Sequence, residues 1–154
     1  MKGPVIDWAV LSPLVALIGG LCIVLLLGLF RSSFVRRGLV PGLTLVCLGV
    51  TAGLCVWQWD DGKTIIEGAL AVDNLTLALT FVFLAAGIAT VLLSWRSSAT
   101  EEAGEGEYFT LLLTSILGMV VLVAANDLVV LFIGFELLSI PLYVLCGSHR
   151  SQAR

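Results

Sequence analysis

One ionisable residue, Glu136, stands near the middle of a long apolar segment that runs from Asn126 to Gly147. Asp127 precedes it by nine residues, which is roughly 13 Å of helix at about 1.5 Å per residue. The carboxyl group is therefore expected near the midplane of a hydrocarbon core about 30 Å thick, where an ionisable side chain costs roughly 2.5 to 3.5 kcal/mol. This position predicts a proton or ion site. The alternative is a neutral glutamate that only hydrogen-bonds neighbouring helices.

The residues after Glu136 add polar groups next to it. Pro141 has no N–H to donate to the carbonyl oxygen of Leu137, so the helix is expected to bend there and leave that oxygen free. Ser139 follows Glu136 by three residues and Tyr143 follows Ser139 by four, which brings both hydroxyls close to the face of Glu136. The freed carbonyl and the two hydroxyls predict a place where water is held beside the carboxyl group.

The composition defines the class of protein. Of the 154 residues, 59% are hydrophobic and only 12% are charged, whereas soluble domains average roughly 25% charged residues. The chain is therefore expected to be an integral membrane protein, and its net charge of −3 gives no indication of nucleic-acid binding. The cysteines have no CxxC spacing and His149 is the only histidine, so neither a metal site nor a haem held by paired histidines is expected. Any redox chemistry is expected to belong to another chain.

Five apolar runs predict an all-α transmembrane domain over residues 1–147. The expected helices are 8–30, 38–59, 74–95, 108–126 and 127–147, and 148–154 form a polar tail. Trp57 and Trp59 are typical of aromatic anchors at the membrane interface. Two pairs of glycines in the second helix, Gly38 with Gly42 and Gly49 with Gly53, predict close packing against a neighbouring helix.

The connections between the helices differ in character. Residues 60–73 contain an alternating stretch, Thr64 to Leu70, that predicts a short strand or hairpin outside the membrane. Residues 96–107 are polar and acidic and are expected to form a solvated loop. The link through Asn126 and Asp127 is so short that the last two helices are expected to form an antiparallel hairpin, with Asp127 as the N-cap of the second.

The basic residues predict the orientation in the membrane. With the N-terminus outside, only Lys2 and Lys63 are external. The six arginines are then cytoplasmic: Arg31, Arg36, Arg37, Arg96, Arg150 and Arg154. This asymmetry follows the positive-inside rule, and five spans place the C-terminus in the cytoplasm.

The stretch around Glu136 resembles a known family. Ala125-Asn-Asp-Leu128, followed by Leu131-Phe-Ile-Gly-Phe-Glu-Leu-Leu-Ser-Ile-Pro-Leu-Tyr-Val-Leu145, is similar to the fifth helix of subunit N of bacterial NADH-quinone oxidoreductase, respiratory complex I. The resemblance covers nearly the whole chain to Gly147. It implies an incomplete portion of an antiporter-like fold with about fourteen transmembrane helices, an inference by analogy with the family.

The resemblance also implies a function and a set of site residues. Glu136 would be the catalytic residue, transferring protons in response to electron transfer, with Ser139, Pro141 and Tyr143 in support and a lysine of a later helix as its partner. No cofactor is expected in this chain, whereas NADH, flavin, iron–sulfur clusters and quinone would belong to partner subunits. The expected partners are the other membrane subunits of complex I, in the lipid bilayer of the bacterial inner membrane.

Two departures from the family leave other interpretations open. The chain stops at Arg154 and has no lysine within its apolar runs, so it is expected to be a fragment, a truncated product or one piece of a split subunit. One alternative is a subunit of a multisubunit cation/proton antiporter, whose helices look similar. The other is a truncated structural membrane protein without transport activity.

Overall fold

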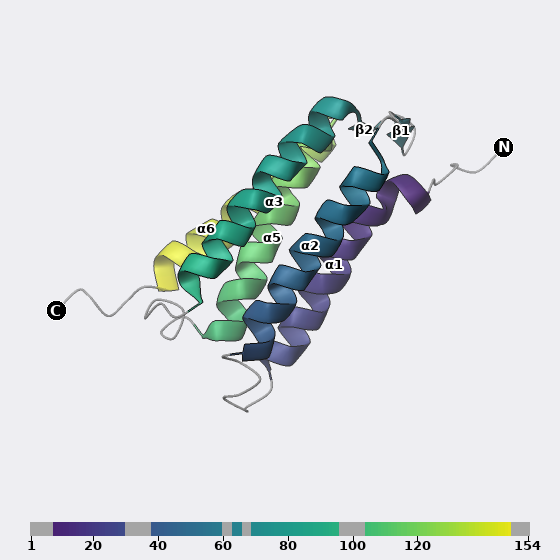
Figure 1. Cartoon of the computed structure of the whole chain (residues 1–154). Coiled ribbons are helices and arrows are strands. Elements are labelled where there is room, and N and C mark those ends of the chain that lie inside the picture. Colours follow the sequence, from purple (N-terminus) through teal and green to yellow (C-terminus); the bar gives the residue numbers. More distant parts are fainter. Residues whose placement is uncertain (1–7, 30–37, 60–62, 66–68, 96–103, 149–154) are drawn as a thin grey trace.

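A computed structural model describes residues 8–29, 38–59, 63–65, 69–95 and 104–148 (Figure 1). Within these residues are five helices long and apolar enough to cross a membrane. They are α1 (Trp8–Gly28), α2 (Val40–Trp57), α3 (Asn74–Ser94), α5 (Glu105–Ala124) and α6 (Leu128–Ser148). The predicted all-α, five-helix membrane fold is confirmed. The six arginines and Lys2 lie outside the described residues, as do 149–154 of the tail, so the orientation stays a prediction.

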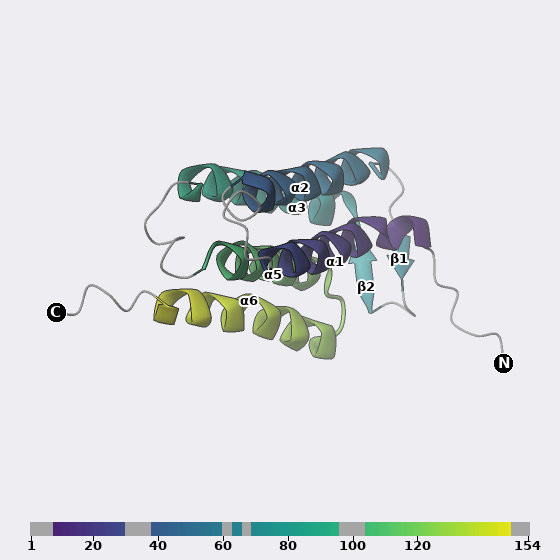
Figure 2. The same ribbon diagram turned by 90° about the horizontal axis from the view of Figure 1, so that it is seen from below.

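The five helices form a bundle with α5 near its centre. Helix α5 contacts α1, α2, α3 and α6 and is the most buried of the five, whereas α6 is the least buried. Figure 2 shows the layers: α2 and α3 lie on one side of α1 and α5, and α6 lies on the other. Helix α6 packs mainly on α5, so its remaining surface is open in the described part of the chain.

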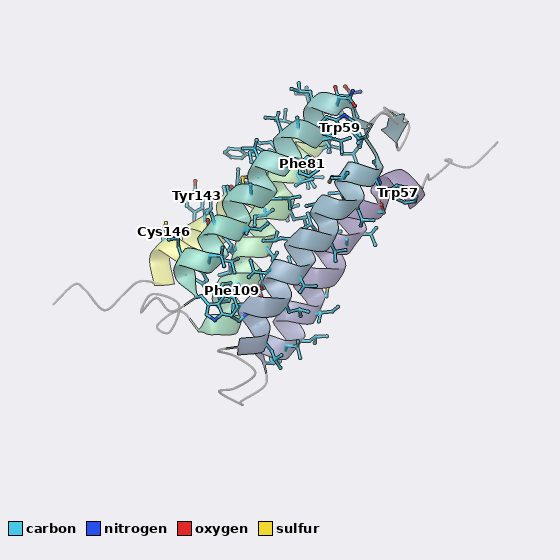
Figure 3. The ribbon with its side chains drawn as sticks, in the orientation of Figure 1. Trp57, Trp59, Phe81, Phe109, Tyr143 and Cys146 are labelled. Atoms are coloured by element: carbon cyan, nitrogen blue, oxygen red, sulfur yellow. The ribbon has the colours of Figure 1, made fainter. Side chains whose placement is uncertain are left out.

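The core lies between the first four of these helices. Its fully buried side chains include Leu17, Val24, Leu48, Leu84, Leu113 and Ile116. Phe109 lies at one end of the core (Figure 3), and its ring is edge-on to that of Tyr108 at a centroid distance of 5.4 Å. None of the described residues of α6 belongs to this core.

Several buried hydroxyl groups are satisfied within their own helices, whereas that of Thr76 in α3 donates to the carbonyl of Ala71 in β2 at 3.2 Å. Thr44 and Thr51 of α2 each donate to the carbonyl oxygen four residues earlier, at 2.8 and 2.9 Å. Thr80 of α3 and Thr110 of α5 do the same at 2.7 Å. Since the bilayer core offers no water to polar groups, such internal hydrogen bonds are what a membrane bundle requires.

A small hairpin joins α2 to α3. Strands β1 (Lys63–Ile65) and β2 (Leu70–Val72) are antiparallel, which confirms the strand or hairpin expected here. The turn between α5 and α6 is tied to the same hairpin, because Ala125 forms a bridge with β2 and the N–H of Asn126 donates to the carbonyl of Ala69 at 2.9 Å. The hairpin therefore connects the α2–α3 and α5–α6 links at one end of the bundle (Figure 1).

Helix α5 begins earlier than expected. Residues 105–107, predicted to belong to a solvated loop, form its first turn, whereas 96–103 of that loop lie outside the described residues. Gly104 has φ 84°, a backbone conformation that glycine adopts without strain, and its carbonyl accepts the N–H of Tyr108 at 2.9 Å. Acidic residues are favourable in a first turn because of the positive end of the helix dipole.

The glycines that bring helices together are not the predicted ones. Among the described residues, no atom lies within 4 Å of a Cβ added at Gly38, Gly42, Gly49 or Gly53, so the close packing expected of them is wrong there. The close approaches are instead made by glycines of other helices. They pair Gly20 with Cys47, Gly28 with Gly106, Gly87 with Ile116, Gly118 with Leu137 and Leu138, and Gly134 with Leu122.

Trp57 and Trp59 lie at the end of α2 that is next to the hairpin. Trp57 is 73% exposed and Trp59 is 47% exposed, and Trp59 contacts Phe81 at a ring-centroid distance of 6.1 Å (Figure 3). Exposed indoles at the end of an apolar helix suit an interfacial position, and that role stays a prediction.

Asp73 caps the start of α3. Its Oδ1 accepts the backbone N–H of Thr76 at 2.8 Å, which satisfies one of the free donors of the first turn. This hydrogen bond holds the pKa of the Asp73 carboxyl below its ordinary value. The folded protein therefore stabilises the carboxylate form of Asp73 relative to the unfolded chain.

This cap should weaken in acid. The pKa of the Asp73 carboxyl is lower in the folded protein than in the unfolded chain. The stability that the cap contributes is therefore fully present above the unfolded pKa and is lost as pH falls through the folded pKa. We expect the melting temperature of the wild type to fall towards that of Asp73→Asn on acidification, since a neutral amide cap does not titrate. Paired melting curves in lipid nanodiscs measure this difference. A difference that stays constant down to the acid limit would contradict the assignment.

Candidate functional site

Helix α6 carries the candidate site and begins directly after the turn from α5. The carbonyl of Asp127 accepts the N–H of Leu131 at 2.9 Å, so Asp127 stands at the position expected of the N-cap. The helices on either side of this turn run antiparallel (Figure 2), as their short link predicted.

Glu136 is the ninth of the 21 residues of α6. At about 1.5 Å per residue this places it roughly 12 Å from the start of the helix. Glu136 therefore lies near the middle of the helix, and its depth in the membrane stays a prediction. In the described part of the chain Glu136 is partly exposed.

The carboxyl-bearing face of α6 points away from α5. Gly134 and Pro141 are buried, and Gly134 lies against Leu122 of α5. Two residues advance a helix by about 200°, so Glu136 projects from nearly the opposite side. Tyr143, which shares its side, is 72% exposed and lies on the outer surface of α6 in Figure 3. The candidate site is thus open on the side away from the bundle.

Ser139 and Tyr143 share the side of Glu136, whereas Pro141 is buried on the opposite side of α6. The hydroxyl of Ser139 donates to the carbonyl of Phe135 at 2.8 Å, so its proton is engaged by the helix and its oxygen remains able to accept. Helix α6 continues through Pro141 to Ser148, and the missing N–H of Pro141 deprives Leu137 of its usual helical donor. The functional roles of these residues stay predictions.

No cation accompanies Glu136 within the helices. All eight lysines and arginines of the sequence fall outside the residue ranges of the five helices. Among the described residues, no group of three or more histidine, cysteine, aspartate or glutamate side chains is placed to hold a metal ion. A positively charged partner for Glu136 would have to come from outside these helices.

A small cavity lies elsewhere in the bundle. Its volume is about 30 Å³ and it is lined by α1, α2, β2, α3 and α5, without any residue of α6. Gln58, Thr76 and Thr80 are its polar residues, and the Gln58 amide donates to the hydroxyl of Ser12 at 2.9 Å. The volume is enough for about two water molecules. This cavity is separate from the face that bears Glu136.

Gly118 and Gly134 are part of the surroundings of Glu136 that the sequence pattern did not distinguish. Each meets the backbone of the facing helix, Gly118 at Leu137 and Leu138 and Gly134 at Leu122. The sequence did contain one indication of the role of Gly134. It precedes Glu136 by two residues and so lies on the opposite side of the helix.

Comparison with known proteins finds relatives along nearly the whole chain. No family model matches it. Subunit N of NADH-quinone oxidoreductase from Saccharopolyspora erythraea is 34% identical over 94% of this chain and 34% of the relative. Subunit N 2 of the same enzyme from Roseiflexus castenholzii is 36% identical over 94% of this chain and 29% of the relative. Subunit N from Cutibacterium acnes is 31% identical over 99% of this chain and 33% of the relative. The chain spans about a third of the length of the curated relatives it matches.

Proposed function

Because the chain belongs to the family of subunit N of NADH-quinone oxidoreductase over nearly all of its residues, we propose that it contributes a proton carrier, Glu136, to a redox-driven proton pump. Relatives with this name belong to an NADH-quinone oxidoreductase, and this chain corresponds to about a third of such a subunit. Proton translocation and the role of Glu136 are our proposal.

The observation that supports the proposal is the placement of Glu136. It lies near the middle of a membrane-spanning helix, on a face that is not packed against α5. A glutamate that served only to bind neighbouring helices would face the helix on which α6 packs. A carboxyl group on the open face is free to meet water or a partner from outside the described bundle.

The proposed step is a simple proton exchange. A neutral carboxyl group transfers its proton to a water molecule or a basic side chain, becomes a carboxylate, and later accepts a proton from the other side of the membrane. Moving one charge against 100 mV costs about 2.3 kcal/mol. We assign the source of this energy to electron transfer from NADH to quinone in partner subunits, together with the flavin and iron–sulfur clusters, and assign no cofactor to this chain.

The open face also suggests what lies beside Glu136. We propose that a basic group, a lysine by resemblance to the family, approaches it from the part of the subunit beyond these residues. A cation nearby would offset the cost of a carboxylate in the membrane. The proposed setting is the bacterial inner membrane, with the N-terminus outside and other membrane subunits of complex I as neighbours.

Purification of the tagged full-length protein from its source membranes tests this function against the alternatives. We expect it to co-purify with NADH:quinone oxidoreductase activity, and the complex in liposomes to move protons when NADH is added. A complex that exchanges cations for protons without oxidising NADH would establish the antiporter interpretation. A protein that migrates alone, without either activity, would favour a structural role.

A further inference from the structure

Helices α5 and α6 approach each other most closely at two glycines. A Cβ added at Gly118 of α5 would lie 2.5 Å from the backbone nitrogen of Leu138 and 2.6 Å from the carbonyl carbon of Leu137. A Cβ added at Gly134 of α6 would lie 2.8 Å from the backbone nitrogen of Leu122. Both glycines are buried. Each helix therefore offers one glycine, and each glycine meets backbone rather than flexible side-chain ends.

These contacts flank Glu136 on the chain. Gly134 precedes it by two residues, and the peptide between Leu137 and Leu138 follows it directly. Within one turn of helix the backbone moves as a unit, so the two contacts determine how far α6 lies from α5 and how it is rotated about its axis. Because the contacts lie on the side opposite to Glu136, they also determine the direction in which its carboxyl group points.

The contact at Gly118 also lies where α6 lacks one of its own backbone hydrogen bonds. Pro141 lacks the N–H that would bond to the carbonyl of Leu137, and helices bend where that bond is missing. The Leu137–Leu138 peptide is the one that Gly118 touches. The contact with Gly118 of α5 therefore restrains the Leu137–Leu138 peptide, in place of the missing hydrogen bond within α6.

We propose that Gly118 and Gly134 are positioning residues that hold Glu136 in place for proton transfer. The inference rests on the proposed function of Glu136. Ordinary contacts of a Cβ begin at 3.4 Å, so an alanine at 118 requires a separation of about 0.9 Å, from 3.4 minus 2.5, and an alanine at 134 about 0.6 Å, from 3.4 minus 2.8. Displacement of a reacting group by about 1 Å lowers rates by as much as about a hundredfold.

The test uses the assembled complex that contains the full-length subunit. Gly118→Ala should lower proton uptake per assembled complex by about tenfold and shift the pH at which uptake is half-maximal, with the complex at wild-type abundance. Gly134→Ala should have the same effects to a smaller extent, because it demands less movement. Gly147→Ala is the matched control, since Gly147 also belongs to α6 and a Cβ there meets no atom within 4 Å.

Glu136→Gln, alone and combined with Gly118→Ala, separates positioning from a general loss of structure. If Gly118 acts through Glu136, the double variant should pump no less than Glu136→Gln alone. Unchanged uptake and an unchanged pH profile in both alanine variants would overturn the positioning role, and so would loss of assembly in both. Normal pumping in Glu136→Gln would instead refute the proposed function, which distinguishes the two failures.

Discussion

Glu136→Gln in the full-length subunit is expected to lower NADH-driven proton uptake by roughly tenfold to a hundredfold while the complex still assembles. Glutamine has nearly the shape of glutamic acid, but its amide cannot release or accept a proton near neutral pH. Positioned groups that transfer protons contribute about a hundredfold or more to the steps they serve. Assembly should survive because Glu136 does not lie on the face that packs against α5.

Proton uptake per NADH oxidised, measured in vesicles with a pH-sensitive dye, checks this expectation. Glu107→Gln is the matched control, since Glu107 is an exposed glutamate in the first turn of α5, at the end of a span rather than its middle. It should pump like the wild type. A Glu136→Gln complex with a normal ratio of protons to electrons would remove Glu136 from the pathway.

The helices and the depth of Glu136 were predictable because a membrane imposes them locally. A run of about 20 apolar residues must form a helix to satisfy its backbone, whatever it packs against. The sequence around the α5–α6 turn therefore predicts a carboxyl group near mid-membrane, and the structure has Glu136 as the ninth of the 21 residues of α6. The sequence did not predict the start of α5 at Glu105, because composition alone assigns charged residues to a loop even when they form the first turn of a helix.

The packing faces were not predictable, because lipid and protein interior are equally apolar. Helix α6 is hydrophobic on all sides, so no periodicity separates the face that rests on α5 from the face that bears Glu136. The same ambiguity explains the glycines. Gly49 and Gly53 have the spacing of a packing motif and face open space among the described residues, whereas Gly118 and Gly134 belong to no such motif and meet the facing backbone.

Leu113→Glu is expected to prevent the bundle from folding, although it repeats the chemistry that the chain tolerates at Glu136. Leu113 is the ninth residue of α5, as Glu136 is the ninth of α6, so both lie near the middle of a span. Leu113 is fully buried in the core. An uncompensated carboxylate there should cost roughly 3 to 5 kcal/mol, because apolar side chains of the core surround it and the five helices contain no lysine or arginine.

Reversible unfolding in mixed micelles measures this loss, with two variants to isolate its cause. Leu113→Met keeps the volume and polarity and should cost less than about 1.5 kcal/mol. Leu93→Glu places the same carboxylate near the end of α3, where the side chain is 84% exposed and reaches the interface, so its effect should be small. If Leu113→Glu unfolds no more readily than Leu93→Glu, α5 is not the centre of the bundle. The open face of α6 would then no longer explain why a carboxyl group is tolerated at position 136.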